Sequence, residues 1–208
     1  MKISIVTPTY NEVENIEKLY LEIKQELVKL NCDYEHIIID NNSNDGTIIK
    51  IKELALKDKN LKIIINSRNY GHIKSPYYGL LQTTGDASIL MASDFQDPIE
   101  LIPKYVEEWK KGNKVVLGEK ISSEENKIKF SIRKIFYNFL NKISETTLTE
   151  NTTGSGIFDK SIILKLKNLQ DPYPYFRGLI SEICSEIKTI KFNQPSRKYG
   201  KTKNNIST

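Results

Sequence analysis

The sequence predicts an α/β protein in which helices flank a mostly parallel, Rossmann-like sheet. Short apolar runs alternate with amphipathic helical patterns, at roughly 25–30 residues per unit, as far as residue 118. Each run ends in a cluster of polar residues, and the loops after parallel strands meet at one edge of the sheet. The composition, 38% hydrophobic and 27% charged over 208 residues, is that of a globular protein of about one domain.

The expected elements follow one another regularly along the first half. Apolar runs predict five strands, at residues 3–7, 34–40, 62–65, 87–91 and 114–118. Apolar stripes at helical spacing predict helices at residues 16–30 and 48–55, and a third that starts at Pro98 and extends to Trp109. This alternation favours parallel strands joined by right-handed crossovers.

The second half, residues 119–208, has a different texture. Residues 128–143 combine an apolar face with basic residues, which predicts an amphipathic helix that lies in a membrane interface, packs on the domain or forms a homodimer. Lys and Arg concentrate in residues 127–142 and 188–203 within a net charge of +5, which favours anionic partners. No signature of a nucleic-acid-binding fold accompanies this charge, so we expect no nucleic-acid partner.

The expected compartment follows from features that the sequence lacks. Cys32 and Cys184 have neither the number nor the spacing of a disulfide framework or a zinc site. No apolar signal stretch follows Met1, and no run approaches the ~20 apolar residues of a membrane-spanning helix. We therefore expect a soluble protein of the reducing cytoplasm.

An acidic run after the fourth strand carries the predicted chemistry. It reads Ser93-Asp94-Phe95-Gln96-Asp97-Pro98. Two carboxylates and an amide supply the hard oxygen ligands that Mg²⁺ or Mn²⁺ prefers, and phosphates commonly complete the shell. The run therefore indicates a metal-assisted diphosphate site. In the alternative interpretation, Asp97 only caps the following helix by accepting a backbone N–H.

Several motifs, taken together, carry a resemblance to a known family. They are Thr7-Pro8-Thr9-Tyr10-Asn11-Glu12, Asp40-Asn41-Asn42-Ser43-Asn44-Asp45-Gly46-Thr47, Arg68-Asn69-Tyr70-Gly71, Gly85-Asp86 and Asp94-Phe95-Gln96-Asp97-Pro98. In this order they resemble family 2 glycosyltransferases of the GT-A fold, and within that family the polyprenyl-phosphate sugar transferases similar to dolichol-phosphate mannosyltransferase. Phe176-Arg177-Gly178-Leu179 and Arg197-Lys198-Tyr199-Gly200-Lys201-Thr202 resemble acceptor-side motifs of the same group.

The resemblance implies one domain, 1–208, with a nucleotide-sugar-binding half at 1–118 and an acceptor-side half at 119–208. The residues implied to contact the donor are Pro8, Tyr10, Glu12, Asp40, Asn41, Arg68, Ser93 and Asp97. Asp94 and Gln96 would hold Mg²⁺ or Mn²⁺. In the alternative interpretation, neither residue contacts a donor: Tyr10 only packs against the protein, and Arg68 forms a surface salt bridge that contributes little to stability.

Two positions depart from the family pattern. Ala92 stands where the metal motif has its first acid, so one oxygen ligand is missing. This departure leaves open a second hypothesis, a non-catalytic nucleotide-sugar-binding module of a glycan assembly complex. Asn41 stands where many relatives have an Asp that accepts from a pyrimidine N3–H. Because an amide can donate or accept, uracil, thymine and cytosine all remain open.

The implied reaction is an inverting transfer to a polyprenyl phosphate or a lipid-linked or cell-surface glycan, at the inner face of the cell membrane. Arg177 would bind an acceptor phosphate through charge-assisted hydrogen bonds; in the alternative interpretation it is a surface arginine at the start of a helix. Glu182 is the candidate base if the acceptor is a sugar hydroxyl, which has to lose a proton. Arg197 and Lys201 would hold an acceptor phosphate or anionic lipid headgroups.

Overall fold

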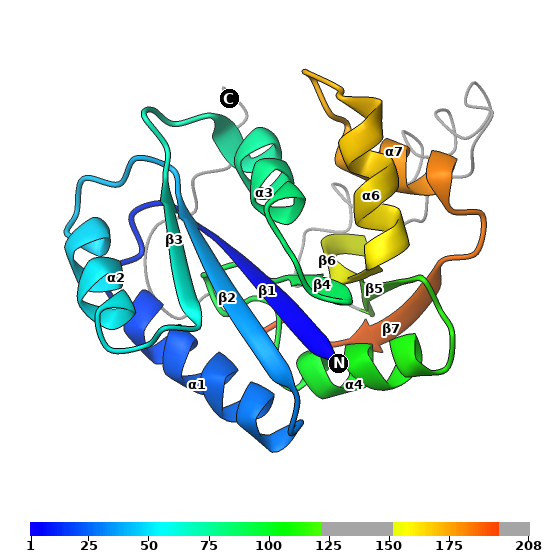
Figure 1. Ribbon diagram of the computed structural model, residues 1–208, viewed down its shortest axis with the longest axis horizontal. Coiled ribbons are helices and arrows are strands. Elements are labelled where there is room, and N and C mark those ends of the chain that lie inside the picture. Colours follow the sequence, from blue (N-terminus) through cyan, green and yellow to red (C-terminus); the bar gives the residue numbers. More distant parts are fainter. Residues whose placement is uncertain (122–151, 196–208) are drawn as a thin grey trace.

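The computed structural model describes residues 1–121 and 152–195, which form a sheet of seven strands flanked by helices (Figure 1). The strands are β1 (Lys2–Thr9), β2 (Asp33–Asp40), β3 (Leu61–Ile65), β4 (Ala87–Leu90), β5 (Val115–Lys120), β6 (Thr152–Asp159) and β7 (Lys188–Phe192). The helices are α1 (Ile16–Lys29), α2 (Thr47–Ala55), α3 (Gly71–Leu81), α4 (Leu101–Lys110), α6 (Lys160–Leu169) and α7 (Phe176–Ile183). The strand order is β3-β2-β1-β4-β6-β5-β7.

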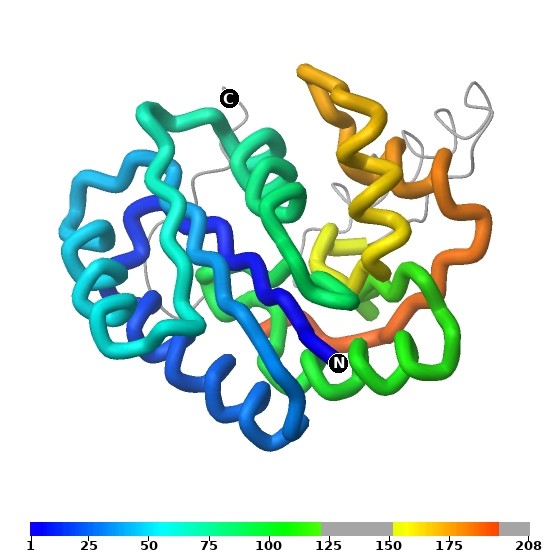
Figure 2. Tube along the Cα trace, in the orientation of Figure 1, coloured from blue at the N-terminus to red at the C-terminus, as the bar shows by residue number. Residues whose placement is uncertain are grey.

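Both faces of the sheet are covered, because successive side chains of a strand point to opposite sides. On β1, Ile3 and Ile5 pack in a cluster with residues of α1 and α4, whereas Val6 packs in a cluster with residues of α3, α6 and α7. Figure 2 shows α3 and α6 on the same side of the sheet, and the Tyr77 hydroxyl of α3 donates to the Leu166 carbonyl of α6 at 3.1 Å.

The predicted parallel pairing is confirmed for the first four strands, where β1 pairs with β2 and β4, and β2 pairs with β3. β6, for which the sequence predicted no strand, lies antiparallel between β4 and β5, so the sheet is mostly parallel, as predicted, with one antiparallel strand. This strand and α6 were not among the expected elements. β6 requires a glycine at position 156, because a Cβ there would lie 2.3 Å from the Val116 carbonyl oxygen of β5.

The start of α4 also differs from the expectation. The helix begins at Leu101 rather than at Pro98, and its N-cap residue is Glu100. Pro98 instead opens a turn in which its carbonyl accepts from the Leu101 N–H at 3.0 Å. Asp97 is therefore not the helix cap, and the capping alternative for this residue is wrong.

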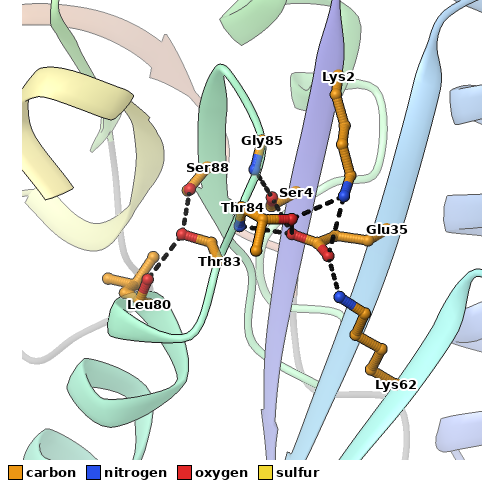
Figure 3. A network of polar contacts seen from close by, with 9 residues as sticks. All are labelled: Lys2, Ser4, Glu35, Lys62, Leu80, Thr83, Thr84, Gly85 and Ser88. Carbon is orange, nitrogen blue, oxygen red and sulfur yellow. Dashed lines mark hydrogen bonds and ion pairs between the residues drawn. The ribbon is translucent and has the colours of Figure 1, made fainter. Parts of the chain in front are cut away.

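A buried carboxylate ties three strands together at the end of the sheet opposite to the polar loops (Figure 3). Glu35 of β2 is 2% exposed and accepts from the Ser4 hydroxyl at 2.7 Å and from Lys62 Nζ at 2.5 Å. Its other donors are Lys2 Nζ at 3.3 Å and the Thr84 N–H at 2.7 Å. Burial alone would raise the pKa of Glu35, but these hydrogen bonds outweigh it and lower the pKa to about 2.

Three predictions fall on residues outside the described ranges: the basic amphipathic helix at 128–143, and the acceptor-side roles of Arg197 and Lys201. In the part of the chain that the structure describes, no helix has the length and apolar character needed to cross a bilayer.

Candidate active site

Two cavities lie side by side at the carboxyl ends of β1, β2 and β4, where the sequence places its polar motifs. The first has a volume of about 440 Å³ and is lined by Pro8, Thr9, Tyr10, Glu12, Asn41, Asn69, Gly71, His72, Ser75, Pro76, Ala92, Ser93 and Asp94. The second has a volume of about 360 Å³, and its polar lining includes Asp97, Thr153, Ser155 and Arg177. The cavities share one wall, made of Pro8, His72, Pro76 and Ala92.

The first cavity brings together the predicted metal ligand Asp94 and five of the eight residues implied to contact the donor: Pro8, Tyr10, Glu12, Asn41 and Ser93. Asp40 lines neither cavity. It is fully buried, and its carboxylate accepts from the Ser43 N–H at 2.8 Å and from the Ser43 hydroxyl at 2.6 Å. Asp40 therefore shapes the loop after β2 from behind the cavity wall, rather than reaching the base or ribose.

The side chain of Asn41 makes all of its hydrogen bonds within the protein. Its Nδ2 donates to Asn69 Oδ1 at 2.7 Å and to the Gly71 carbonyl at 3.2 Å. Its Oδ1 accepts from Asn66 Nδ2 at 3.1 Å and from the Tyr70 N–H at 2.9 Å. A carboxamide has two donors and two lone pairs, so the side chain of Asn41 has no hydrogen-bonding capacity left for a base. The side chain instead joins the end of β2 to the start of α3.

A second set of hydrogen bonds fixes the loop after β1 to the loop after β2. The Asn11 N–H donates to the Ser43 hydroxyl at 2.8 Å, and the Glu12 N–H donates to the Thr47 hydroxyl at 2.9 Å. Asp45 accepts from the Val13 N–H at 3.2 Å. Burial tends to raise the pKa of Asp45, but hydrogen bonds from Thr47 and Val13 lower it below its ordinary value. The first cavity is thus held open by short polar side chains before any ligand binds.

The acidic run makes a tight turn beside the first cavity. Asp94 lines the cavity, and its Oδ1 accepts from the Gln96 N–H at 3.1 Å, whereas the Gln96 side chain lines neither cavity. Phe95 between them has a φ of 59°, and its buried ring packs in the core under Lys18 Nζ, 5.9 Å from the ring centroid. A bulky residue adopts this left-handed conformation only when its surroundings enforce it. The buried ring therefore fixes the backbone between Asp94 and Gln96.

The protein alone does not supply a full metal shell at this turn. Among residues 1–121 and 152–195, no group of three or more His, Cys, Asp or Glu side chains could hold a metal ion. The Asp94 carboxylate and the Gln96 carboxamide are nevertheless hard oxygen donors, which fit Mg²⁺ or Mn²⁺ when phosphate and water oxygens complete the shell.

Asp97 belongs to the second cavity. It is 5% exposed, and within the described ranges its Oδ1 has no hydrogen-bond partner, although the Thr153 hydroxyl and the Ala92 N–H donate to the carboxylate. Burial, followed by the nearby charge of Asp94, raises the pKa of Asp97 to about 6. Arg177 of α7 lines the same cavity next to Gly154. The second cavity therefore combines a buried acid with a guanidinium group.

Two other predicted residues lie away from both cavities. Arg68 is exposed and stacks over the Tyr70 ring, with the guanidinium carbon 4.7 Å from the ring centroid. Glu182 is exposed on α7 and lines neither cavity, so in this structure it does not reach the site as a base would have to. Conversely, sequence reasoning missed His72 and Asn69, although both lie in or next to a recognised motif. It also missed Thr153 and Ser155, whose segment gave no strand signal.

Comparisons with known proteins agree with this geometry. A family model described as "Glycosyl transferase family 2" matches residues 4–186. The chain is 30% identical to the glycosyltransferase YkcC of Bacillus subtilis over 201 residues, which cover 96% of this chain and 62% of YkcC. It is also 30% identical to the bactoprenol glucosyl transferase of Shigella phage SfX over 206 residues, 99% of this chain and 68% of that protein.

A solved structure extends the comparison to the fold. Glucosyl-3-phosphoglycerate synthase from Mycobacterium tuberculosis, in complex with Mn²⁺, UDP and glucosyl-3-phosphoglycerate, matches with a TM-score of 0.62 at 16% identity. The match covers 96% of this chain and 73% of that one. It confirms the predicted α/β fold of the GT-A type. The chain spans slightly less than two thirds of the length of its relative YkcC, of which 62% is covered.

Proposed function

Because the chain belongs to glycosyl transferase family 2, we propose that it moves a sugar from a nucleoside-diphosphate sugar to a polyprenyl phosphate or lipid-linked glycan. The donor would bind in the first cavity and the acceptor in the second. The observation that carries the proposal is the shared wall, which places the Asp94 carboxylate on one cavity and the Arg177 guanidinium on its neighbour. Two substrates bound in this way would meet beside Ala92.

Asp94 and Gln96 would hold a Mg²⁺ or Mn²⁺ ion against the donor diphosphate, as the chemistry of these side chains allows. When bound, such an ion neutralises charge that develops on a departing diphosphate. The chain's own part is to orient the two ligands, through the enforced backbone at Phe95 and the bond from the Gln96 N–H to Asp94. The mycobacterial synthase, which has the same fold, was solved with Mn²⁺ and UDP, so Mn²⁺ is the first ion to test.

The nucleobase would not be read by Asn41, because its amide is fully used within the protein. Asn41 would act as a fixed part of the wall, beside Asn69, whose Oδ1 is also occupied by Asn41 Nδ2 and the Gly71 N–H. The side chain of Asn69 could therefore bind a base only by donating from its amino group. UDP is the first nucleotide to test, given the mycobacterial complex.

On the acceptor side, Arg177 would bind the phosphate of a polyprenyl phosphate. One phosphate oxygen would attack the anomeric carbon from the face opposite the diphosphate, and the electron pair of the breaking C–O bond would leave with the diphosphate. The phosphate oxygen is already ionised near neutral pH, so no base is required and the exposed position of Glu182 is no obstacle. The name of the phage relative, a bactoprenol glucosyl transferase, supports a lipid acceptor.

Contact with the inner membrane face would follow from such an acceptor. Arg197 and Lys201, and the basic helix expected at residues 128–143, remain our predictions for that contact.

A thermal-shift panel tests the proposal. UDP-, GDP-, CDP- and dTDP-sugars would be added with and without Mn²⁺, since a ligand that binds only the native state raises the unfolding midpoint. We expect a Mn²⁺-dependent rise with one nucleotide, followed by transfer to a polyprenyl phosphate. A flat panel with every donor would overturn the proposal.

A further inference from the structure

His72 occupies a position that no other polar residue in the described ranges shares. It lines both cavities, together with Pro8, Pro76 and Ala92. Two prolines and an alanine offer no polar side-chain atom, so the imidazole is the one polar side chain of the common wall. Any ligand group at the junction of the cavities that needs a side-chain partner from this wall meets His72.

The two histidines of the chain differ sharply in their surroundings. His36 is buried, contacts the Thr7 hydroxyl through Nε2 at 2.9 Å, and burial lowers its pKa to about 3. Such a histidine is a neutral part of the core. His72 is exposed in the first turn of α3, and no residue in 1–121 or 152–195 hydrogen-bonds to its ring. Its hydrogen-bonding capacity is available to a ligand.

The chemistry of the junction identifies the ligand group. With the diphosphate beside Asp94 and the attacking oxygen beside Arg177, the group between them is the transferred sugar. A hexose presents adjacent hydroxyl groups, each of which donates and accepts. A neutral imidazole has one donor and one acceptor nitrogen, which suits such a pair.

Ala92 strengthens this argument. An acid at this position would place a carboxylate on the shared wall, but the methyl group of Ala92 leaves the wall without one. Ser93 and Asp94 line only the first cavity, and Asp97 and Arg177 only the second. His72 is thus placed to contact the sugar from the wall where Ala92 presents no acid.

We propose that His72 binds the hydroxyl groups of the transferred sugar and thereby helps to determine which hexose the protein accepts. This inference rests on the proposed function, since it requires a sugar nucleotide in the first cavity. It makes His72 a specificity residue for the sugar, distinct from residues that bind the nucleotide.

The test compares sugar nucleotides with the free nucleotide. Binding of UDP, UDP-glucose, UDP-galactose and UDP-N-acetylglucosamine, all with Mn²⁺, is measured by calorimetry for the wild type, His72→Ala and His72→Gln. We expect His72→Ala to weaken the best sugar nucleotide by about 5- to 30-fold, the value of two neutral hydrogen bonds, and to change UDP affinity by less than about 2-fold. His72→Gln, which keeps a donor and an acceptor, should recover part of the loss.

Lys74→Ala is the matched control, because Lys74 lies in the same turn of α3 but lines neither cavity and instead places Nζ 3.9 Å from the Tyr173 ring centroid. The control should bind all four ligands as the wild type does. An equal loss of UDP and UDP-sugar affinity in His72→Ala, or no loss of either, would overturn the inference while leaving the proposed function intact. A wild-type chain that binds none of the four ligands and none of the GDP-, CDP- or dTDP-sugars of the thermal-shift panel would overturn both. If the panel selects another base, the same comparison is made with that nucleotide and its sugars.

Discussion

The two cavities are built in different ways, although they share a wall. The first is framed by the loops that follow β1, β2 and β3. Hydrogen bonds within and between the first two loops occupy Asp40 and Asp45, and hydrogen bonds to the segment from Asn66 to Gly71 occupy the Asn41 side chain. The second draws its lining from α3, β6 and the start of α7, and keeps a buried carboxylate oxygen, Asp97 Oδ1, without a partner in the described residues.

The difference separates polar residues that hold the shape of the site from polar residues that can bind a ligand. A polar side chain that is saturated by the protein fixes the shape of a cavity, because moving it would break several hydrogen bonds at once. A buried polar atom without a partner is costly, so a site that keeps one gains when a ligand satisfies it. We therefore expect substitutions in the first wall to damage the structure and those in the second to damage acceptor use.

The largest effect is expected for Asn41→Asp, which replaces the carboxamide by a carboxylate of the same shape. The carboxylate would lose both donated hydrogen bonds and would face Asn69 Oδ1 and the Gly71 carbonyl. We predict a loss of about 3 kcal/mol in the free energy of unfolding, measured by urea denaturation, and weaker UDP binding. Asn42→Asp at the exposed neighbouring position is the control. A stable Asn41→Asp protein with tighter UDP binding would contradict the supporting role.

Arg177→Ala should produce the opposite pattern. Because the guanidinium lines only the second cavity, we predict that transfer to a polyprenyl phosphate falls by about 10- to 100-fold, whereas UDP binding and the unfolding midpoint stay close to wild type. Steady-state transfer assays and calorimetry measure the two quantities. Lys160→Ala, at an exposed residue of α6, controls for the loss of one positive charge. Parallel losses of UDP binding and transfer would place Arg177 at the donor.

A pH titration of stability tests the Glu35 network, which lies at the end of the sheet opposite to both cavities. The pKa of Glu35 is about 2 in the folded protein and near 4.5 when unperturbed, so its contribution to stability is fully present above pH 4.5 and is lost as the pH falls toward 2. We expect this contribution to be about 1–2 kcal/mol, because the lysine partners are partly exposed to solvent. Urea denaturation between pH 5 and 3 should therefore show a shallower decline for Glu35→Gln than for the wild type. Parallel declines would exclude the network as the cause.

The smallest effect is expected for Ala92→Asp. The new carboxylate would lie on the shared wall near Asp94, and we predict Mn²⁺ affinity in the presence of UDP to rise by about 3- to 10-fold. Ala92→Asn has the same shape without the charge and should leave the affinity unchanged. Equal effects of the two substitutions would show that shape, rather than a further oxygen anion, governs metal binding.

The first half of the fold could be read from the sequence because each element there carries its own periodic pattern. β1 to β5 and helices α1, α2 and α4 lie where apolar runs and stripes predicted them, with shifts of a few residues. β6 could not be read in this way, because Thr152–Asp159 is rich in Gly, Ser and Thr and becomes a strand through its pairing with β4 and β5. β7 was hidden for another reason: its lysines at 188 and 191 were counted as part of a basic cluster.

The site shows the same limit at the level of side chains. Residue types predicted where the site lies, and Tyr10, Glu12 and Asp94 do line the first cavity. Residue types did not predict which way a side chain points. Asp40 points inward and bonds to Ser43, and Asn41 bonds to the segment from Asn66 to Gly71, which lies nearby only in the folded chain. His72 gave no signal, because its importance arises from two cavities that meet.

In the proposed function, a divalent ion holds the donor in the first cavity through Asp94. UDP should be titrated calorimetrically into the wild type and into Asp94→Asn, with and without Mn²⁺. We predict that Mn²⁺ tightens UDP binding to the wild type by at least about 10-fold and has no effect on Asp94→Asn, while both proteins unfold at similar temperatures. Equal tightening in the two proteins, or none in the wild type, would contradict the assignment of the first cavity as a metal-assisted nucleotide site.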